Sequence, residues 1–294
     1  MKVTSRRSLI LGAGASIIVP KSADAMYKAA RRTFVSPAST GVATDAAATA
    51  WKNQVVTNGG TVSAARLALV SAMIAGLKTD GVWTLLDRLF IFGAENEQSA
   101  LTSLVNPSLI ITKTGTPTFT TDRGYTPSAG NYVKDTVYSF ASGTNYLLNS
   151  GHLMVYVNNS GGVSTNCDIA DNNNAGGFVC MQTNFTGNLM NAQINTSSTG
   201  TSANSGATGS FIGSRTGSSL HSNYQNGTLL GSPNTGQQSI GAATIQFNQS
   251  GNNTNRLGAA SVGGGLTAAQ VSGNGRTTGL DGRILTYLTA IGGN

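Results

Sequence analysis

The sequence predicts a mainly β fold, an antiparallel sandwich or barrel preceded by a small helical N-terminal subdomain. Two observations predict this class. Only 10% of the 294 residues are charged and 38 are glycine, a composition typical of turn-rich β proteins rather than of helical bundles. In addition, the spacing of the apolar residues is helical before Pro107, whereas short apolar runs separated by turn-forming residues follow it.

Helical periodicity is clearest in the segment before Pro107. Residues 61–78 place their large apolar side chains on one helical face, and either Thr61 or Ser63 is positioned to cap the first turn. Residues 95–105 have acids in their first turn, which is typical of a helix start. The apolar run 82–92 lies between these two segments, and we expect it to belong to the same helical subdomain.

Three parts are expected along the chain. Residues 1–25 form a basic signal-like or anchoring arm, residues 26–107 a connector and a helical attachment subdomain, and residues 108–294 a β-sandwich with a C-terminal helix over 280–291. Because the periodicity changes at residue 107, we expect the sandwich to fold without the helices. Its expected strands are 109–112, 137–140, 152–157, 177–182, 189–194, 210–213, 219–224, 243–247 and 257–262.

The net charge of +7 is concentrated near the N-terminus. Seven of the 18 basic residues fall within the first 32 positions, together with a single acid, Asp24. Eleven basic and ten acidic residues remain, so the rest of the chain carries a net charge of only +1. A nearly neutral body lacks the basic surface that sequence-independent nucleic-acid binding needs. We therefore expect no nucleic-acid partner.

The first 25 residues have the layout of an export signal. A basic start contains Arg6 and Arg7, an apolar stretch covers residues 9–19, and residues 23–25 read Ala-Asp-Ala. This arrangement resembles a twin-arginine signal with its cleavage site. The alternative is an uncleaved basic arm that packs against a partner. Because a membrane span needs about 20 apolar residues, we expect no stable membrane span here.

Several stretches of the sequence look familiar together. They are 80–89 with 94–96, 117–125, the Ile-Gly-Ser-Arg strand 212–215, the Asn-Gly turn 224–227 and the ending 283–292. These stretches resemble proteins of tailed bacteriophages and prophages that carry a laminin-G/concanavalin-like jelly roll. The resemblance covers roughly residues 50–294 and implies an antiparallel jelly-roll sandwich on a virion. The glycine-rich segment 272–279 departs from the continuous helix that the resemblance implies there.

The sequence contains no recognisable cluster of catalytic groups; the sandwich region holds only scattered aspartates, Asp122, Asp135, Asp168, Asp171 and Asp281. Jelly-roll glycoside hydrolases use two carboxylates about 5–9.5 Å apart, but the only glutamates, Glu95 and Glu97, lie in the predicted helical subdomain. The only histidines, His152 and His221, occur in no recognisable nucleophile or base motif. We therefore predict no enzymatic activity, no catalytic residues and no cofactor.

One loop contains hard oxygen ligands of the kind that Ca²⁺ prefers. The candidate ligands are Asp168, Asp171 and Asn173. The simpler interpretation is a solvated turn, because Asp and Asn readily adopt turn conformations. We favour the turn and predict no metal, with this Ca²⁺ site as the alternative.

The two cysteines are expected to be cross-strand neighbours. Folding the chain symmetrically about the polar loop 171–176 places Cys167 opposite Cys180, and Ile169 opposite Phe178 on the same face. The pair is either a disulfide or two buried thiols, and we favour thiols because the flanking residues are apolar. Cα atoms more than about 7 Å apart exclude a bridge.

Together these observations predict a bacteriophage virion structural protein. It is a non-catalytic decoration or fibre-like module, a homo-oligomer that contacts other virion proteins and binds host-surface glycans. The alternative is a twin-arginine-exported, lectin-like carbohydrate-binding protein in the periplasm or outside the cell. Sugar binding needs an aromatic platform and hydrogen-bonding groups. The tyrosines available to the sandwich for this purpose are Tyr125, Tyr132, Tyr138, Tyr146, Tyr156 and Tyr224.

Overall fold

The computed structural model describes residues 43–164, 166–171, 179–248 and 253–294. Thr44–Asn294 form one compact unit, in which two antiparallel sheets enclose a common core and helices precede them in the chain. The expected fold class, a mainly β antiparallel jelly-roll sandwich with N-terminal helices, is confirmed. The arm expected over residues 1–25 lies outside the described residues.

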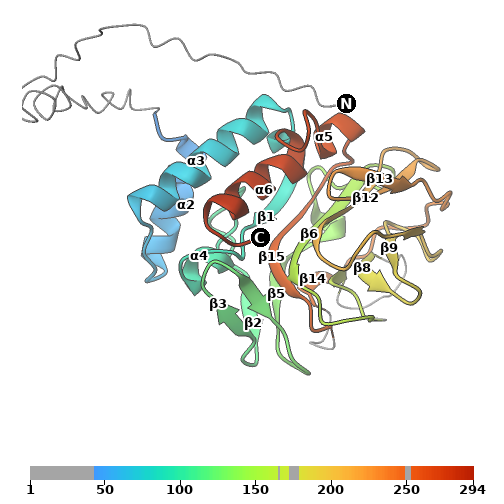
Figure 1. Cartoon of the computed structure of the whole chain (residues 1–294), viewed down its shortest axis with the longest axis horizontal. Helices are drawn as coiled ribbons and strands as arrows, with labels where there is room; N and C mark the ends of the chain where they lie inside the picture. The colour runs from blue at the N-terminus through green and yellow to red at the C-terminus, as the bar shows by residue number, and fades with distance from the viewer. Residues whose placement is uncertain (1–42, 165, 172–178, 249–252) are drawn as a thin grey trace, which may run out of the picture. The chain divides into compact units, whose positions relative to one another are not determined.

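The strands form two sheets (Figure 1), and every strand pairing in the described residues is antiparallel. The eight-stranded sheet has the order β13-β12-β11-β6-β15-β4-β3, and β1 also pairs with β15; the seven-stranded sheet has the order β10-β9-β8-β7-β14-β5-β2. The strands of the first sheet are β1 (Leu86–Phe90), β3 (Thr118–Thr120), β4 (Gly124–Thr126), β6 (Gly151–Asn159), β11 (Gly209–Arg215), β12 (His221–Gln225), β13 (Thr228–Gly231) and β15 (Arg256–Gly263). Those of the second are β2 (Thr112–Thr114), β5 (Tyr132–Ser139), β7 (Ile169–Asp171), β8 (Cys180–Phe185), β9 (Leu189–Gln193), β10 (Thr201–Ala203) and β14 (Thr244–Phe247).

Four of the five described α-helices begin at a residue whose side chain caps the first turn. Ser63 accepts a hydrogen bond from the Arg66 amide and starts the long helix α3. Residues 46–57, within the expected connector and helical attachment subdomain, form a regular helix because Asp45 caps it and Trp51 is buried. The α-helices are α2 (Ala46–Thr57), α3 (Ala64–Thr79), α4 (Glu97–Leu101), α5 (Ala268–Val271) and α6 (Gly279–Ala290), with 3-10 turns η1 (Trp83–Leu85) and η2 (Phe140–Ser142).

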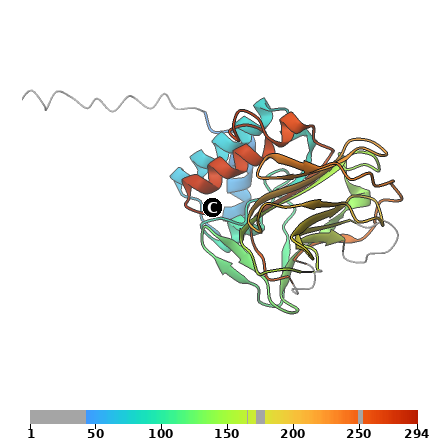
Figure 2. The same cartoon turned by 45° about the vertical axis from the view of Figure 1, so that its right-hand side comes forward.

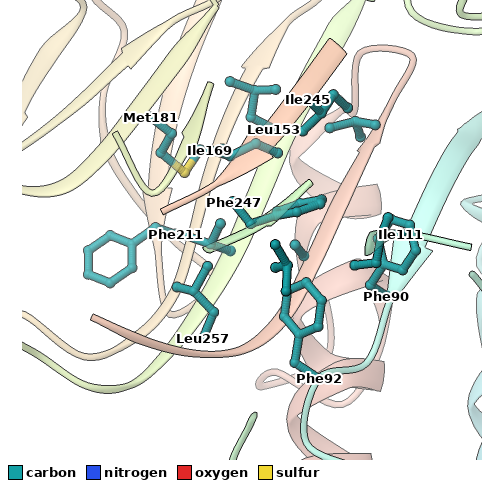
Figure 3. Close-up of a cluster of buried hydrophobic side chains, with 14 of the residues drawn as sticks. Phe90, Phe92, Ile111, Leu153, Ile169, Met181, Phe211, Ile245, Phe247 and Leu257 are labelled. Carbon is teal, nitrogen blue, oxygen red and sulfur yellow. The ribbon is translucent and has the colours of Figure 1, made fainter. Parts of the chain in front are cut away.

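The main hydrophobic core fills the space between the two sheets (Figure 3). Phe211 of the eight-stranded sheet and Met181 of the seven-stranded sheet both belong to it. The ring of Phe247 lies edge-on to two rings from the N-terminal region, with centroids 5.6 Å from Phe90 and 5.4 Å from Phe92. Such edge-to-face pairs add to the stabilisation that burial provides.

A second core lies between the helices and the outer face of the eight-stranded sheet. In it, Leu77 of α3 and Ile284 of α6 are fully buried together with Met154 and Ala259 of the sheet. The two helices lie side by side in both views (Figure 1, Figure 2). One face of this sheet is therefore covered by helices and the other by the second sheet.

Strand β1 contradicts the boundary expected at residue 107. Leu86–Phe90 pairs with β15, with Phe90 opposite Ala260, and Phe90 lies in the core between the sheets. The run 82–92 is thus part of the sandwich rather than of a separate helical subdomain. A short apolar run has no periodicity that distinguishes a buried strand from a buried helix, which is why the sequence did not predict the strand.

The hairpin that carries the cysteines has a different register from the expected one. The structure pairs Ala170 with Cys180 and Ile169 with Met181, whereas symmetric folding placed Cys167 opposite Cys180. The physical cause is Asp168, whose carboxylate is drawn into a buried network and accepts a hydrogen bond from the Thr183 amide.

The two cysteines are nevertheless neighbours. Their Cα atoms are 5.5 Å apart, and a disulfide joins them in place of the thiols that we favoured. Cys167 and Cys180 pack with Ala170 in a small cluster separate from the main core that holds Ile169. The cysteines and Ile169 therefore do not share a face, and Phe178 lies outside the described residues.

Candidate functional site

A groove of about 560 Å³ opens where β1 and β5 meet two loops. Its floor contains Asp87 and Arg88, and its rim is built largely from uncharged residues. Among the lining residues only these two carry a full charge. The remaining lining residues are Leu86, Val105, Asn106, Leu109, Val137, Tyr138, Ser142, Thr144 and Asn145.

A β-bulge brings the two charged residues to the groove. Leu86 pairs with Gly263 and Arg88 pairs with Val262, so Asp87 is an extra residue with no direct partner on β15. A bulge disturbs the strict alternation of side chains and redirects them. Two consecutive residues of one strand therefore line the same groove.

The Asp87 carboxylate is held by three donors. Oδ1 accepts from the Asn145 amide at 2.9 Å, while Oδ2 accepts from the Tyr146 amide at 2.9 Å and from the Tyr138 hydroxyl at 3.0 Å. Burial, followed by the charge of Asp87, raises the pKa of the Tyr138 hydroxyl above its usual value. Tyr138 thus stays protonated and donates. The Gly143 backbone fits beside this carboxylate because a Cβ there would lie 2.7 Å from Oδ2.

The Arg88 guanidinium is buried and partly engaged. Its Nε donates to Asp135 Oδ2 at 2.9 Å and its Nη1 to the Asp87 carbonyl at 2.9 Å, with the guanidinium carbon 4.5 Å from the centre of the Tyr138 ring. Asp135 also accepts from the amides of Val137 and Tyr138. Arg88 Nη2 donates to no residue that the structure describes. The floor therefore offers a free donor next to a carboxylate.

The rim of the groove combines polar groups with one apolar contact. Asn106, Ser142 and Thr144 are exposed, and Val137 is 61% exposed. This mixture of amide, hydroxyl and aliphatic groups suits a ligand with many hydroxyl groups and small apolar faces.

The residues considered for catalysis lie away from the groove and are engaged elsewhere. Burial lowers the pKa of His152 to about 4, and its Nδ1 lies 2.6 Å from the Gly264 carbonyl. Burial, followed by the charge of Arg215, also lowers the pKa of His221 to about 4. Glu95 accepts from the Ser63 amide, and Glu97 forms an ion pair with Lys113 at 2.8 Å.

The candidate Ca²⁺ ligands do not form an open oxygen cage in the described chain. Asp168 is fully buried. Its Oδ1 accepts hydrogen bonds from the side-chain amides of Asn253 and Asn255 at 2.6 and 2.8 Å, and its Oδ2 accepts one from the backbone amide of Thr183. Burial raises the pKa of this carboxyl. Asp171 is also buried, and Asn173 lies outside the described residues. No cluster of three acidic, histidine or cysteine ligands occurs in residues 43–294 as far as they are described.

The tyrosines that we considered as a sugar platform are mostly core residues. Tyr132 is half-buried on β5. The other five are buried, and among them Tyr138 lies at the groove, under Arg88. The buried members are Tyr125, Tyr138, Tyr146, Tyr156 and Tyr224.

Sequence reasoning did not identify Asp87, Arg88 or Asp135 as site residues. The available signal was an adjacent acid and base inside the apolar run 82–92, where charged residues are rarely buried without partners. The partner Asp135 is far away in the chain, and only the sheet arrangement brings it to Arg88.

This chain resembles known proteins in its backbone structure but not in its sequence. No family model and no curated protein matches the sequence. Domain 4 of AbnA, a GH43 extracellular arabinanase from Geobacillus stearothermophilus solved with arabinotriose, is 13% identical, and the match covers 64% of this chain and 96% of that chain with a TM-score of 0.45.

Two larger proteins match over part of their length. A Trypanosoma rangeli sialidase mutant is 9% identical over 79% of this chain and 40% of that chain, with a TM-score of 0.47. The botulinum neurotoxin serotype D binding domain is 10% identical over 63% of this chain and 50% of that chain, with a TM-score of 0.43. At these values the likeness carries no argument about function.

None of the helices in the described chain is both long enough and apolar enough to cross a bilayer.

Proposed function

We propose that this chain is a non-catalytic carbohydrate-binding module and that the groove over Asp87 and Arg88 is its sugar site. The observation that carries this proposal is the groove floor, where a carboxylate and a free guanidinium nitrogen lie on consecutive residues beneath an uncharged polar rim. Sugar hydroxyls both donate and accept hydrogen bonds, so they complement such a pair.

The lack of a reactive pair supports the non-catalytic part of the proposal. Asp87 and Asp135 are both held by several protein donors. Histidines with a pKa of about 4 are neutral at pH 7, and neither lines the groove. General acid–base catalysis requires a proton-transferring group within reach of the substrate, and the one carboxylate that lines the groove, Asp87, is buried and held by three protein donors.

A groove-filling substitution tests the proposed site. We expect Thr144→Trp to weaken glycan binding at least about tenfold, because the indole occupies the space above the floor. The measurement is binding of the full chain, fluorescently labelled, to an array of neutral and acidic glycans. The matched control is Thr57→Trp on the exposed face of α2, which should bind like the wild type.

Two outcomes would contradict this proposal. Wild-type protein that binds no glycan on the array would refute carbohydrate binding. Equal binding by Thr144→Trp and the wild type would place the sugar site elsewhere. Thermal unfolding of both variants establishes that they are folded.

We also propose that the module acts outside the cytoplasm. The Cys167–Cys180 disulfide supports this setting because disulfides persist in oxidising compartments, and the twin-arginine-like start is consistent with export. Protein purified from its producing cells should begin at Met26. Retention of residues 1–25 would instead favour the assembly role on a virion, which rests on the sequence resemblance.

A further inference from the structure

The charges beneath the groove restrict which sugars it accepts. Arg88 contributes one positive charge, but the salt bridge to Asp135 at 2.9 Å neutralises it. Asp87 then adds a negative charge that has no ionic partner among the described residues. These three side chains together therefore carry a net formal charge of −1.

The hydrogen-bonding capacity that remains is balanced between donor and acceptor. Arg88 Nη2 is a donor without a partner in the described chain. Asp87 Oδ1 accepts only the Asn145 amide, so one of its two lone pairs is left for a ligand. Two adjacent hydroxyls satisfy both atoms, since one accepts from the guanidinium while the other donates to the carboxylate.

A carboxylate in place of one of the two hydroxyls satisfies only half of this arrangement, because it accepts from Arg88 but has no proton to donate to Asp87. A uronic acid that presents its adjacent ring hydroxyls keeps both hydrogen bonds. It also brings a second negative charge close to Asp87 in a partly desolvated site, where like charges repel strongly. Resting on the proposed function, we propose that the groove selects neutral saccharides with adjacent free hydroxyls and discriminates against uronic-acid forms of the same sugars.

The test compares each glycan with its own oxidised form. Neutral polysaccharides and the same polysaccharides with the C6 hydroxyl oxidised to a carboxylate are titrated by isothermal calorimetry against residues 44–294, the compact unit that lacks the basic N-terminal residues. We expect the oxidised form to bind at least about tenfold more weakly. Equal or tighter binding of the oxidised form would overturn the selectivity while leaving carbohydrate binding intact. Binding of neither form would overturn both proposals.

The charge argument also predicts how the selectivity responds to mutation and to salt. Asp135→Asn keeps the shape of the Asp135 side chain but frees the charge of Arg88, so binding of the oxidised form should strengthen about fivefold. In the wild type, raising the salt concentration from about 0.02 M to about 0.5 M should strengthen binding of the oxidised form by screening the repulsion. The salt measurement needs no variant, so it tests the charge repulsion even if Asp135→Asn fails to fold. An oxidised form that binds more weakly at high salt would contradict repulsion as the cause.

Discussion

A chain that begins at residue 108 is expected not to fold. Such a truncation removes β1 from the eight-stranded sheet and takes Phe90 and Phe92 out of the main core. Losing a buried phenylalanine side chain costs about 3–5 kcal/mol, so the two together approach the 5–15 kcal/mol that typically stabilises a whole domain. The truncation also strips α3 from the outer face of the sheet and exposes Met154 and Ile212.

Circular dichroism and thermal unfolding of residues 44–294 and 108–294 measure this effect. The longer chain should unfold cooperatively, because residues 44–294 form one compact unit. The shorter chain should show no cooperative transition. A truncated protein with the same unfolding midpoint as the longer chain would show that β1 and the helices contribute little, in conflict with the packing described above.

Replacing Arg215 is expected to be the most destabilising single substitution. This arginine is fully buried, and its guanidinium donates to the carbonyls of Ile194 at 2.8 Å, Ser218 at 2.8 Å and Thr235 at 2.9 Å. Arg215→Ala leaves these acceptors without donors, at about 1–3 kcal/mol for each, and opens a cavity. We therefore expect a loss of roughly 4 kcal/mol or more in the free energy of unfolding.

Urea denaturation measures this loss as a shift in the midpoint at constant slope. Arg215→Lys should also destabilise, by about 2 kcal/mol or more, because an ammonium group lacks the planar fork that reaches three loops at once. The control is Arg123→Ala, whose side chain makes an exposed hydrogen bond to the Asn294 carbonyl and should change stability by about 0.5 kcal/mol or less. An Arg215→Ala protein with the same free energy of unfolding as the wild type would show that water molecules replace the hydrogen bonds of the guanidinium.

The parts of the fold that the sequence predicted are those with a local signature. Ser63 caps α3, residues 279–290 form the final helix, and the Asn-Gly turn adopts left-handed backbone at both residues, with φ of 51° at Asn226 and 76° at Gly227. Long apolar runs such as 152–157 lie within real strands. Such features follow from neighbouring residues alone.

The parts that the sequence did not predict depend on distant partners. Strands β3, β7 and β10 are three residues long, too short to show an alternating pattern. Arg215 binds main-chain carbonyls, which have no sequence signature.

The candidate groove could not be predicted from the sequence for the same reason. It requires a bulge in β1 and an ion pair between Arg88 and Asp135, neither of which local spacing reveals. In the sequence, Asp87 and Arg88 appear only as an adjacent acid and base within the apolar run 82–92.

The pairing of β1 with β15 has a consequence for how the chain folds. A strand near the start of the described chain is completed by one near its end, and the Arg66 guanidinium bonds to the hydroxyl of Tyr287, 221 residues further along. Folds dominated by contacts so remote in sequence have a high contact order and fold slowly, because the entropy of closing long loops must be lost before the contacts form. During synthesis the core between the sheets stays incomplete until almost the whole chain has left the ribosome.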